Sequence, residues 1–172
     1  MSGDPTEEIA RIVAALGLEP HPEGGHYAEV YRATEGAAGN ALPPRYGGQV
    51  RSFGTAIYYL LGPGDVSAMH RVASDEIFHF YLGDPVEQLH LLPDGGHRTV
   101  EIGPDLGAGQ RPQVLVPHGV WQGARLKSGG RFALMGCTVN PGFDFADFEM
   151  GARADLTAGW PEAKAMIEAL TG

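Results

Sequence analysis

The sequence predicts an all-β protein, built as a barrel or sandwich of short strands with a helix at each end. Short apolar or alternating segments follow one another through the middle of the 172-residue chain, and glycine- and proline-rich turns separate them. The segments expected to form strands are 26–34, 51–61, 77–82, 86–92, 98–102, 113–116, 120–126 and 132–139. The 26 glycines and 13 prolines are spread along the whole chain, which is typical of many strands joined by tight turns.

Helical patterns occur at the two ends of the chain. Asp4 can cap a helix that begins at Pro5, and Gly17 is placed to end it. Apolar residues recur between them at helical spacing, at Ile9, Ile12, Val13 and Leu16. We therefore expect a first helix over 5–16 and a second one over 161–170.

Length, charge and composition limit the class of protein. A chain of this length suits one domain, so we expect a single domain over 1–172 with the barrel over about 26–140. The net charge of −9 argues against nucleic acid as a partner, because its phosphates would be repelled. No apolar run reaches the ~20 residues of a membrane helix and no targeting segment is visible. We expect a cytoplasmic protein that does not associate with membranes.

The segment from Gly64 to Gly83 carries the most informative spacing. Its landmarks are Gly64, His70, Val72, Glu76 and Gly83. This spacing resembles the first motif of the cupin superfamily at every position except Val72, where that motif usually has a second histidine. In cupins, the two histidines and the glutamate point into the barrel and hold a divalent metal.

Other segments extend the resemblance along the chain. Residues 116–122 resemble the second cupin motif in part, with Gln122 at the position of its histidine. Further segments are similar to the "cupin 5" group of small cupins, a domain of unknown function; these are 21–32, 55–61, 75–81 and 140–145. The resemblance covers about residues 9–170. It implies a jelly-roll β-barrel, usually dimeric, with a pocket like those of sugar-nucleotide epimerases, and it names no substrate.

A metal site is one possible use of the motif residues. Side chains alternate across a strand, so if His70 and Glu76 point inward, Gln122 can join them. His79 then points outward unless a bulge re-aims it. One imidazole, one carboxylate and one amide make a poor ligand set for a transition metal. A divalent metal (Ni, Mn, Fe or Zn) on His70, Glu76 and Gln122 is therefore the alternative, which would indicate a metal-dependent oxygenase or isomerase.

Without a metal, the same residues suit acid–base chemistry. A histidine in a pocket can act as base or acid near neutral pH, and a nearby glutamate can orient it. By analogy of fold, we expect an isomerase or epimerase acting on a keto-sugar-like or other small polar substrate. The catalytic candidates are His70, Glu76 and His79, with His70 or His79 as the base. The returning acid would be Tyr59 or Tyr81.

Several further residues are candidates for contacting a small ligand. Those expected to bind substrate are Arg51, Arg71, Gln122, Tyr59 and Glu23. Arg32 is a third arginine that could contact an anion. The loop from His21 to Gly25, which carries Glu23, and the loop 35–48 are candidates for a lid or pocket rim. The remaining alternative function is a ligand-binding module without catalysis. Whatever the function, we expect a homodimer.

Other notable side chains have structural interpretations. Cys137 lies in an apolar run and is expected to be a small buried hydrophobic residue. The aromatic residues expected in core or interface packing are Phe143, Phe145 and Phe148. The histidines expected at the surface or in turns are His90, His97 and His118.

Overall fold

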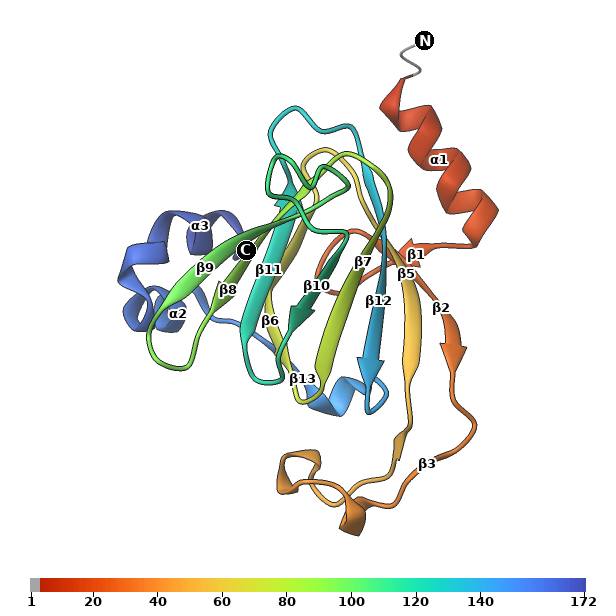
Figure 1. Ribbon diagram of the computed structural model, residues 1–172, viewed down its shortest axis with the longest axis vertical. Helices are drawn as coiled ribbons and strands as arrows, with labels where there is room; N and C mark the ends of the chain where they lie inside the picture. The colour runs from red at the N-terminus through yellow and green to blue at the C-terminus, as the bar shows by residue number, and fades with distance from the viewer. Residues whose placement is uncertain (1–3) are drawn as a thin grey trace.

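Two antiparallel sheets face each other in the computed structural model of the protein, which describes residues 4–172 (Figure 1). The six-stranded sheet contains, in spatial order, β1 (Glu19–Pro20), β2 (His26–Arg32), β5 (Thr55–Leu61), β12 (Ala133–Asn140), β7 (Asp75–Gly83) and β10 (Gln113–Val116). The five-stranded sheet contains β13 (Phe148–Met150), β6 (Val66–Val72), β11 (Trp121–Leu126), β8 (Val86–Leu91) and β9 (His97–Ile102). The predicted all-β jelly-roll barrel with short helices is confirmed.

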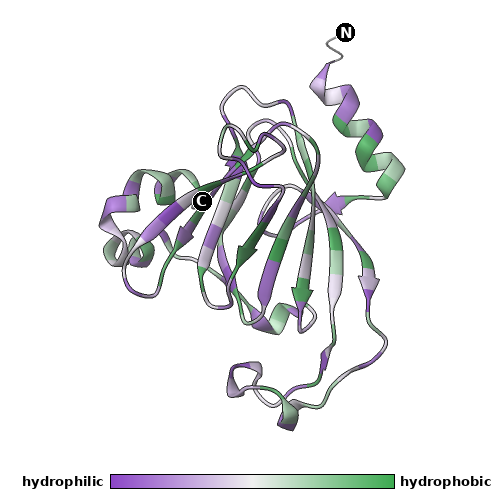
Figure 2. Cartoon of the chain, in the orientation of Figure 1, coloured by the Kyte–Doolittle hydropathy of each residue, from purple (hydrophilic) through white to green (hydrophobic). Residues whose placement is uncertain are grey.

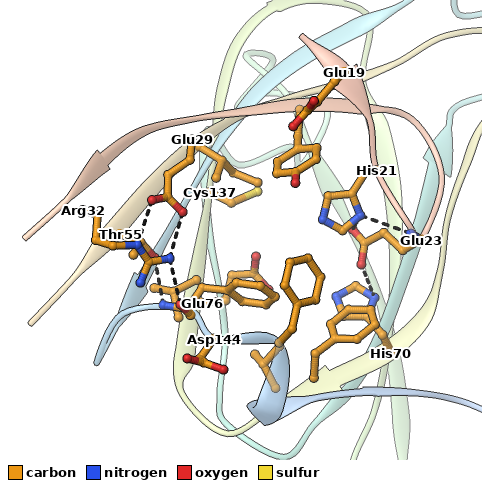
Figure 3. Close-up of a pocket in the computed structure, with 17 residues that line it drawn as sticks. Glu19, His21, Glu23, Glu29, Arg32, Thr55, His70, Glu76, Cys137 and Asp144 are labelled. Atoms are coloured by element: carbon orange, nitrogen blue, oxygen red, sulfur yellow. Dashed lines mark hydrogen bonds and ion pairs between the residues drawn. The ribbon is translucent and has the colours of Figure 1, made fainter. Parts of the chain in front are cut away.

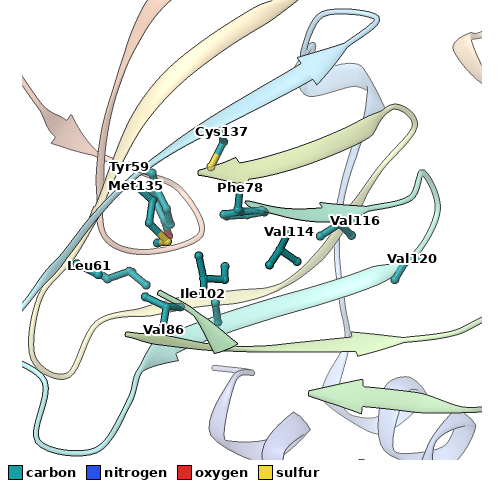
Figure 4. Packing of buried hydrophobic residues seen from close by; sticks show 12 residues of the cluster. Tyr59, Leu61, Phe78, Val86, Ile102, Val114, Val116, Val120, Met135 and Cys137 are labelled. Atoms are coloured by element: carbon teal, nitrogen blue, oxygen red, sulfur yellow. The ribbon is translucent and has the colours of Figure 1, made fainter. Parts of the chain in front are cut away.

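The interior of the barrel divides into an apolar end and a polar end. Along β5, Tyr59 and Leu61 belong to the apolar core, whereas Thr55 and Ile57 line a cavity. The two sheets meet in that core through Phe78, Val86, Ile102, Val114, Val116, Val120 and Met135 (Figure 4). Burying each such side chain contributes about 1.5–3 kcal/mol. The filled end therefore fixes the two sheets against each other and leaves the other end free to form a site.

Helices cover part of the outer face of each sheet. The first helix, α1 (Pro5–Leu16), is capped by Asp4, whose carboxylate accepts from Thr6 N at 2.9 Å. Its apolar side packs against Leu18, Leu60, Phe132 and Leu134 on the six-stranded sheet. Figure 2 shows how polar and apolar residues alternate along α1 and the strands. No helix within residues 4–172 has the length and apolar character needed to cross a membrane.

The C-terminal region contains more helix than the sequence predicts. Helix α2 (Arg153–Gly159) precedes a 3-10 turn (Pro161–Ala163) and helix α3 (Lys164–Ala169), where one helix over 161–170 was expected. The apolar residues of this region pack on Met69, Leu89 and Leu91, on the outer face of the five-stranded sheet. Burial of this face of β6 and β8 explains why Leu89 and Leu91 occupy the outer face of β8.

A bulge in β6 decides which side chains face the interior. The pairing with β11 matches Gln122 with His70 but Ala124 with Ser67, so β6 carries one extra residue. Strict alternation from His70 would turn Val66 inward. Instead, Val66 packs with the C-terminal helices, and Ser67 reaches the polar side chains inside the barrel.

The loop expected over 35–48 folds as a separate arm. It contains β3 (Gly36–Ala37), which pairs with β4 (Arg51–Ser52), and two 3-10 turns. The arm lies at one end of the barrel strands (Figure 1), and its second turn packs back on the barrel, where Tyr46 is buried and its hydroxyl group bonds Ser74 Oγ at 2.9 Å. None of residues 35–48 lines the cavity at the polar end. It does not form the lid that its length suggested.

Candidate functional site

A cavity of about 330 Å³ opens at the polar end of the barrel (Figure 3). Its polar lining consists of Glu19, His21, Glu23, Glu29, Arg32, Thr55, His70, Glu76, Cys137 and Asp144. Its apolar lining consists of Tyr27, Ile57, Val72, Val139, Phe143, Phe145 and Phe148. An apolar hollow with a few converging ionisable groups is the usual form of a small-molecule site.

The turn from His21 to Gly25 places Glu23 inside the barrel. Gly24 has a φ of 108°, and a Cβ there would lie 2.0 Å from the carbonyl oxygen of Val66, so only glycine fits. The turn is tied to the barrel by Ala68 N, which donates to Glu23 O at 2.8 Å. The Tyr59 hydroxyl also donates to Gly24 O at 2.7 Å. The loop that the sequence marks as a pocket rim is therefore a rigid part of the cavity wall.

His70 and Glu23 form a buried ion pair in this wall. His70 Nδ1 lies 2.9 Å from Glu23 Oε2 and 2.8 Å from the carbonyl oxygen of Ala68. Burial by itself lowers the pKa of His70, but the Glu23 carboxylate outweighs burial and raises this pKa to about 9. Burial opposes ionisation of Glu23, and the His70 imidazolium overcomes it, so the pKa of Glu23 is lowered. At neutral pH the pair is an imidazolium and a carboxylate.

Two neighbours complete the surroundings of this pair. The Ser67 hydroxyl, which the bulge turns inward, donates to Glu23 Oε1 at 3.0 Å. Phe148 stacks on the His70 ring with a centroid distance of 5.2 Å and an interplanar angle of 25°. Figure 3 shows His21, Glu23 and His70 grouped on one side of the cavity, with Glu29 and Arg32 on the other.

Glu76, on β7, is the second titratable centre of the cavity. Its side chain accepts a hydrogen bond of 2.7 Å from Gln122 Nε2. Burial raises the pKa of Glu76 to about 7, although the nearby charge of His70 opposes the increase. A carboxyl group with this pKa can both take and return a proton near neutral pH.

The residues expected to hold a metal do not fit that role. Gln122 presents its amide nitrogen to Glu76, and its oxygen accepts from Gln88 at 3.2 Å instead. His70 Nδ1 is engaged by Glu23 Oε2 at 2.9 Å and by the carbonyl oxygen of Ala68 at 2.8 Å. Within residues 4–172, no group of three His, Cys, Asp or Glu side chains is arranged to bind a metal ion. The described residues show no metal site on His70, Glu76 and Gln122.

Two catalytic candidates lie outside the cavity. His79 is on the outer face of β7, where its ring bonds Thr138 Oγ1 at 2.9 Å. The irregularity in the pairing of β7 falls beyond Phe80, so alternation from the inward Glu76 turns His79 outward. Tyr81 lies on the same outer face, 6.1 Å from the ring of Tyr58. Neither side chain can act on a ligand in the cavity.

Three of the predicted substrate-binding residues have structural partners instead. Arg51 is buried and donates two hydrogen bonds of 2.7 Å to Asp147. Arg71 is exposed, pairs with Glu149 at 2.7 Å and lies 4.4 Å above the Trp121 ring. Tyr59 belongs to the apolar core. None of these three lines the cavity, and Gln122 lies behind Glu76 rather than on the cavity surface. Glu23 does line it.

The structure adds lining residues that the sequence did not single out. Glu29 binds Arg32 through two hydrogen bonds of 2.8 Å, and Arg32 also donates to the carbonyl oxygen of Phe143 at 3.0 Å. Glu29 shares the inward face of β2 with Tyr27, so alternation along this strand was an available signal. Glu19 and Asp144 contribute further carboxylates, and nothing in their local sequence distinguishes them from surface residues.

Three phenylalanines and one histidine have a place that differs from the one expected. Phe143, Phe145 and Phe148 do pack together, with Phe143 and Phe145 ring centroids 4.9 Å apart, but they also line the cavity. His90, expected at the surface, is fully buried inside the barrel. It shares the inward face of β8 with Gln88, so two polar residues alternate with apolar ones along this strand.

A jelly-roll barrel with first-motif residues turned into a cavity defines a cupin. Over residues 10–151, the chain matches the profile of the Cupin_5 family, described as cupin superfamily (DUF985), and it belongs to that family. The resemblance stated from the motifs is thereby confirmed.

Solved structures and a curated relative agree with this assignment. A protein from Shewanella oneidensis, SO0799, is 38% identical with a TM-score of 0.81, covering 94% of this chain and 96% of that one. A hypothetical protein from Leishmania major is 31% identical with a TM-score of 0.85, covering 94% and 97%. The yeast protein YML079W, from Saccharomyces cerevisiae and described as uncharacterized, is 27% identical over 84% of this chain and 75% of its own length.

More distant structures share the fold alone. A dTDP sugar isomerase from Desulfovibrio desulfuricans is 19% identical with a TM-score of 0.51, over 58% of this chain and 65% of that one. Oxalate decarboxylase from Bacillus subtilis is 14% identical with a TM-score of 0.53, over 89% of this chain and 37% of that one. The chain is thus a cupin whose cavity suits a small molecule.

Proposed function

We propose that this cupin is an isomerase or epimerase that moves a proton on a small polar carbonyl compound. The observation that supports this most is the presence of two ionisable centres of different character in one cavity. One is the Glu23–His70 ion pair, and the other is Glu76 with a pKa of about 7. Titratable groups whose surroundings separate their pKa values are suited to acid and base roles.

The proposed roles differ from those expected from the sequence. His70 is already protonated, so Glu76 serves as the base and the His70 imidazolium as the acid. The Glu76 carboxylate takes the proton from the carbon next to the substrate carbonyl, and the C–H electron pair moves toward the carbonyl oxygen. His70 stabilises the resulting oxyanion by donating a hydrogen bond to it. His70 then gives its proton to the oxyanion and regains one from the hydroxyl group on the neighbouring carbon, while Glu76 returns its proton to the former carbonyl carbon. These transfers convert an α-hydroxy carbonyl compound into its isomer.

The charges that line the cavity favour an uncharged substrate. Arg32 is the one guanidinium among the described lining residues, and Glu29 already neutralises it. Glu19 and Asp144 add negative charge. A nucleoside diphosphate would need cationic groups that are not engaged elsewhere. We therefore propose a neutral keto-sugar-like compound, whose apolar ring face can rest on the phenylalanine cluster.

Exchange of substrate hydrogen with solvent tests this proposal before the product is known. Uncharged ketoses and aldoses are incubated with the protein in D₂O, and loss of the C–H signal next to the carbonyl is followed by NMR. We expect exchange with wild type, a loss of at least 100-fold in Glu76→Gln, and no loss in the exposed control Glu35→Gln. Saturable binding without exchange in any compound would overturn the enzymatic proposal and leave a binding module.

We also propose a cytoplasmic homodimer. Tyr31, Tyr81 and Leu115 lie on the outer face of the six-stranded sheet and are about half exposed, which a second copy would cover. The single cysteine, Cys137, is buried as a free thiol, which suits a reducing compartment. Sedimentation analysis should give a dimer that Tyr81→Lys converts to a monomer. A monomeric wild type would exclude this assembly.

A further inference from the structure

A line of four hydrogen bonds crosses the interior of the barrel and ends on Glu76. Arg98 Nε donates to His90 Nδ1 at 3.1 Å, and His90 Nε2 bonds Gln88 Oε1 at 2.8 Å. Gln88 Nε2 then donates to Gln122 Oε1 at 3.2 Å, and Gln122 Nε2 donates to Glu76 Oε2 at 2.7 Å. The three central side chains are at most 1% exposed.

Strand register brings these side chains together. Arg98 on β9 pairs directly with His90 on β8, His90 pairs with Gln122 on β11, and Gln122 pairs with His70 on β6. Gln88 lies on the same inward face of β8 as His90, two residues away. The opposite face of β8 carries Leu89, which packs against the C-terminal helices. A row of polar residues thus crosses the five-stranded sheet and reaches the cavity.

The chemistry of Arg98 sets the direction of the whole chain. A guanidinium can only donate, so His90 Nδ1 must accept and His90 Nε2 must carry the proton. Burial lowers the pKa of His90 to about 4, and the charge of Arg98 adds to the effect, so the ring is neutral near pH 7. With His90 donating, Gln88 must turn its oxygen toward it and its nitrogen toward Gln122. Gln122 must then offer its nitrogen to Glu76.

The reverse direction would change the state of Glu76. If the two amides turned over, Gln122 would present its oxygen to Glu76. A carboxylate facing that oxygen would be repelled, so Glu76 would have to be protonated and donate. The present direction offers Glu76 a donor, which favours the carboxylate.

We propose that Arg98 and His90 are positioning residues that fix the direction of this chain and thereby hold Glu76 as a hydrogen-bond acceptor. Neither residue lines the cavity. They act through Gln88 and Gln122, from the five-stranded sheet to Glu76 in the six-stranded sheet. This proposal rests on the proposed function in one respect only, the role of Glu76 toward a substrate.

The other charged or titratable groups around Glu76 lie outside this chain of hydrogen bonds. They are His70 from β6, Glu23 from the rim turn and Cys137 from β12. None of them bonds Arg98 or His90 in the described structure. A change in the titration of Glu76 after substitution of Arg98 or His90 therefore reports on the chain.

The test reads the titration of Glu76 directly and needs no substrate. Protein labelled with ¹³C at glutamate carboxyl carbons is titrated by NMR, and Glu76→Gln identifies the Glu76 signal. In Arg98→Met and His90→Phe, we expect the midpoint of Glu76 to move above its wild-type value of about 7. Arg98→Lys, which keeps a group that can only donate, should restore the wild-type midpoint.

Two controls separate positioning from loss of structure. Leu89→Ala removes an equally buried side chain from the opposite face of β8 and should lower thermal stability without moving the Glu76 midpoint. Arg125→Met removes a guanidinium from a neighbouring strand and should leave the midpoint unchanged. An Arg98→Met midpoint equal to that of Arg125→Met would overturn the proposal. Failure of the exchange experiment above would not affect this readout.

Discussion

Glu76 and Gln122 are joined by a hydrogen bond of 2.7 Å at the positions where the two cupin motifs place a glutamate and a histidine. The amide nitrogen of Gln122 donates to the Glu76 carboxylate. A hydrogen bond therefore joins the two side chains at the positions where the motifs would place two metal ligands. The departure from the motif at Gln122 and the departure at Val72 therefore have one consequence. Both remove imidazole ligands from the cavity and leave its carboxyl group free to titrate.

The first prediction concerns the pH dependence of stability at Glu76. The folded pKa of about 7 lies above the ordinary value of 4.5, so between these values the folded state keeps a proton that the unfolded state has lost. Stability contributed by this site consequently falls as pH rises through the window. Glu76→Gln removes this loss, and its stability relative to wild type should increase from pH 5 to pH 8, by at most about 3 kcal/mol. Urea unfolding at both pH values measures it, and a constant difference would contradict it.

The second prediction concerns the buried pair of His70 and Glu23. Removing one partner leaves the other charge uncompensated, so His70→Ala or Glu23→Ala should each destabilise the protein by about 3–5 kcal/mol. The double variant should lose much less than the sum of the two, because no lone charge is left. Denaturant unfolding of all four proteins gives the coupling. Additive losses would show that the pair is not coupled.

The same pair has a defined pH window. The pKa of His70 is raised to about 9, so its stabilising contribution is full below 6.5 and is lost as pH rises through 9. The pKa of Glu23 is lowered, so its contribution is full above 4.5 and is lost as pH falls through the lowered value. The coupling between the two should therefore be largest between about pH 4.5 and 6.5 and should decline on the alkaline side.

The third prediction concerns Gly24, which gives the rim turn its shape. An alanine Cβ would meet the carbonyl oxygen of Val66 at 2.0 Å in a backbone with φ of 108°. Gly24→Ala should destabilise the protein by about 2 kcal/mol or more and displace Glu23, so the pKa of His70 should fall below about 9. NMR titration of His70 measures the second effect. Gly64→Ala is the control, because Gly64 also has a positive φ but no atom lies near its Cβ position. An unchanged His70 titration in Gly24→Ala would show that the turn does not hold Glu23.

The barrel could be predicted from the sequence because its signals are local. Alternation and glycine turns mark most strands, and the caps Asp4 and Gly17 bound α1. Strand β6 carries His70 but was not predicted as a strand, because its polar and apolar residues follow no regular pattern. Only the motif spacing pointed to this segment. Helix α2 was missed because no side chain caps its start at Ala152.

The candidate site was predicted only in part, because partners distant in sequence decide what each side chain does. His70, Glu76 and Glu23 were expected from motif and loop, and all three line the cavity. From the sequence, Arg51 could not be distinguished from an arginine that binds a ligand. The fold places Asp147 against it, and the two form an ion pair. The protonation state of His70 depends on Glu23, which is distant in sequence and meets His70 only in the folded protein. The spacing within one motif cannot reveal such a contact.

The last prediction concerns the missing imidazole at Val72. This side chain lines the cavity and shares the inward face of β6 with His70, so Val72→His brings a third group to His70 and Glu76. Three ligands with histidine and carboxylate donors suit a divalent transition metal. Nickel or manganese should raise the melting temperature of Val72→His, and plasma mass spectrometry should find about one bound metal per chain. Neither metal should raise the melting temperature of wild type, because without the added imidazole only His70 and Glu76 could act as ligands. Leu115→His, which adds a histidine on the exposed outer face, is the control and should also show no shift. A wild-type protein that gains as much stability from metal as Val72→His would show that the native residues already form a metal site.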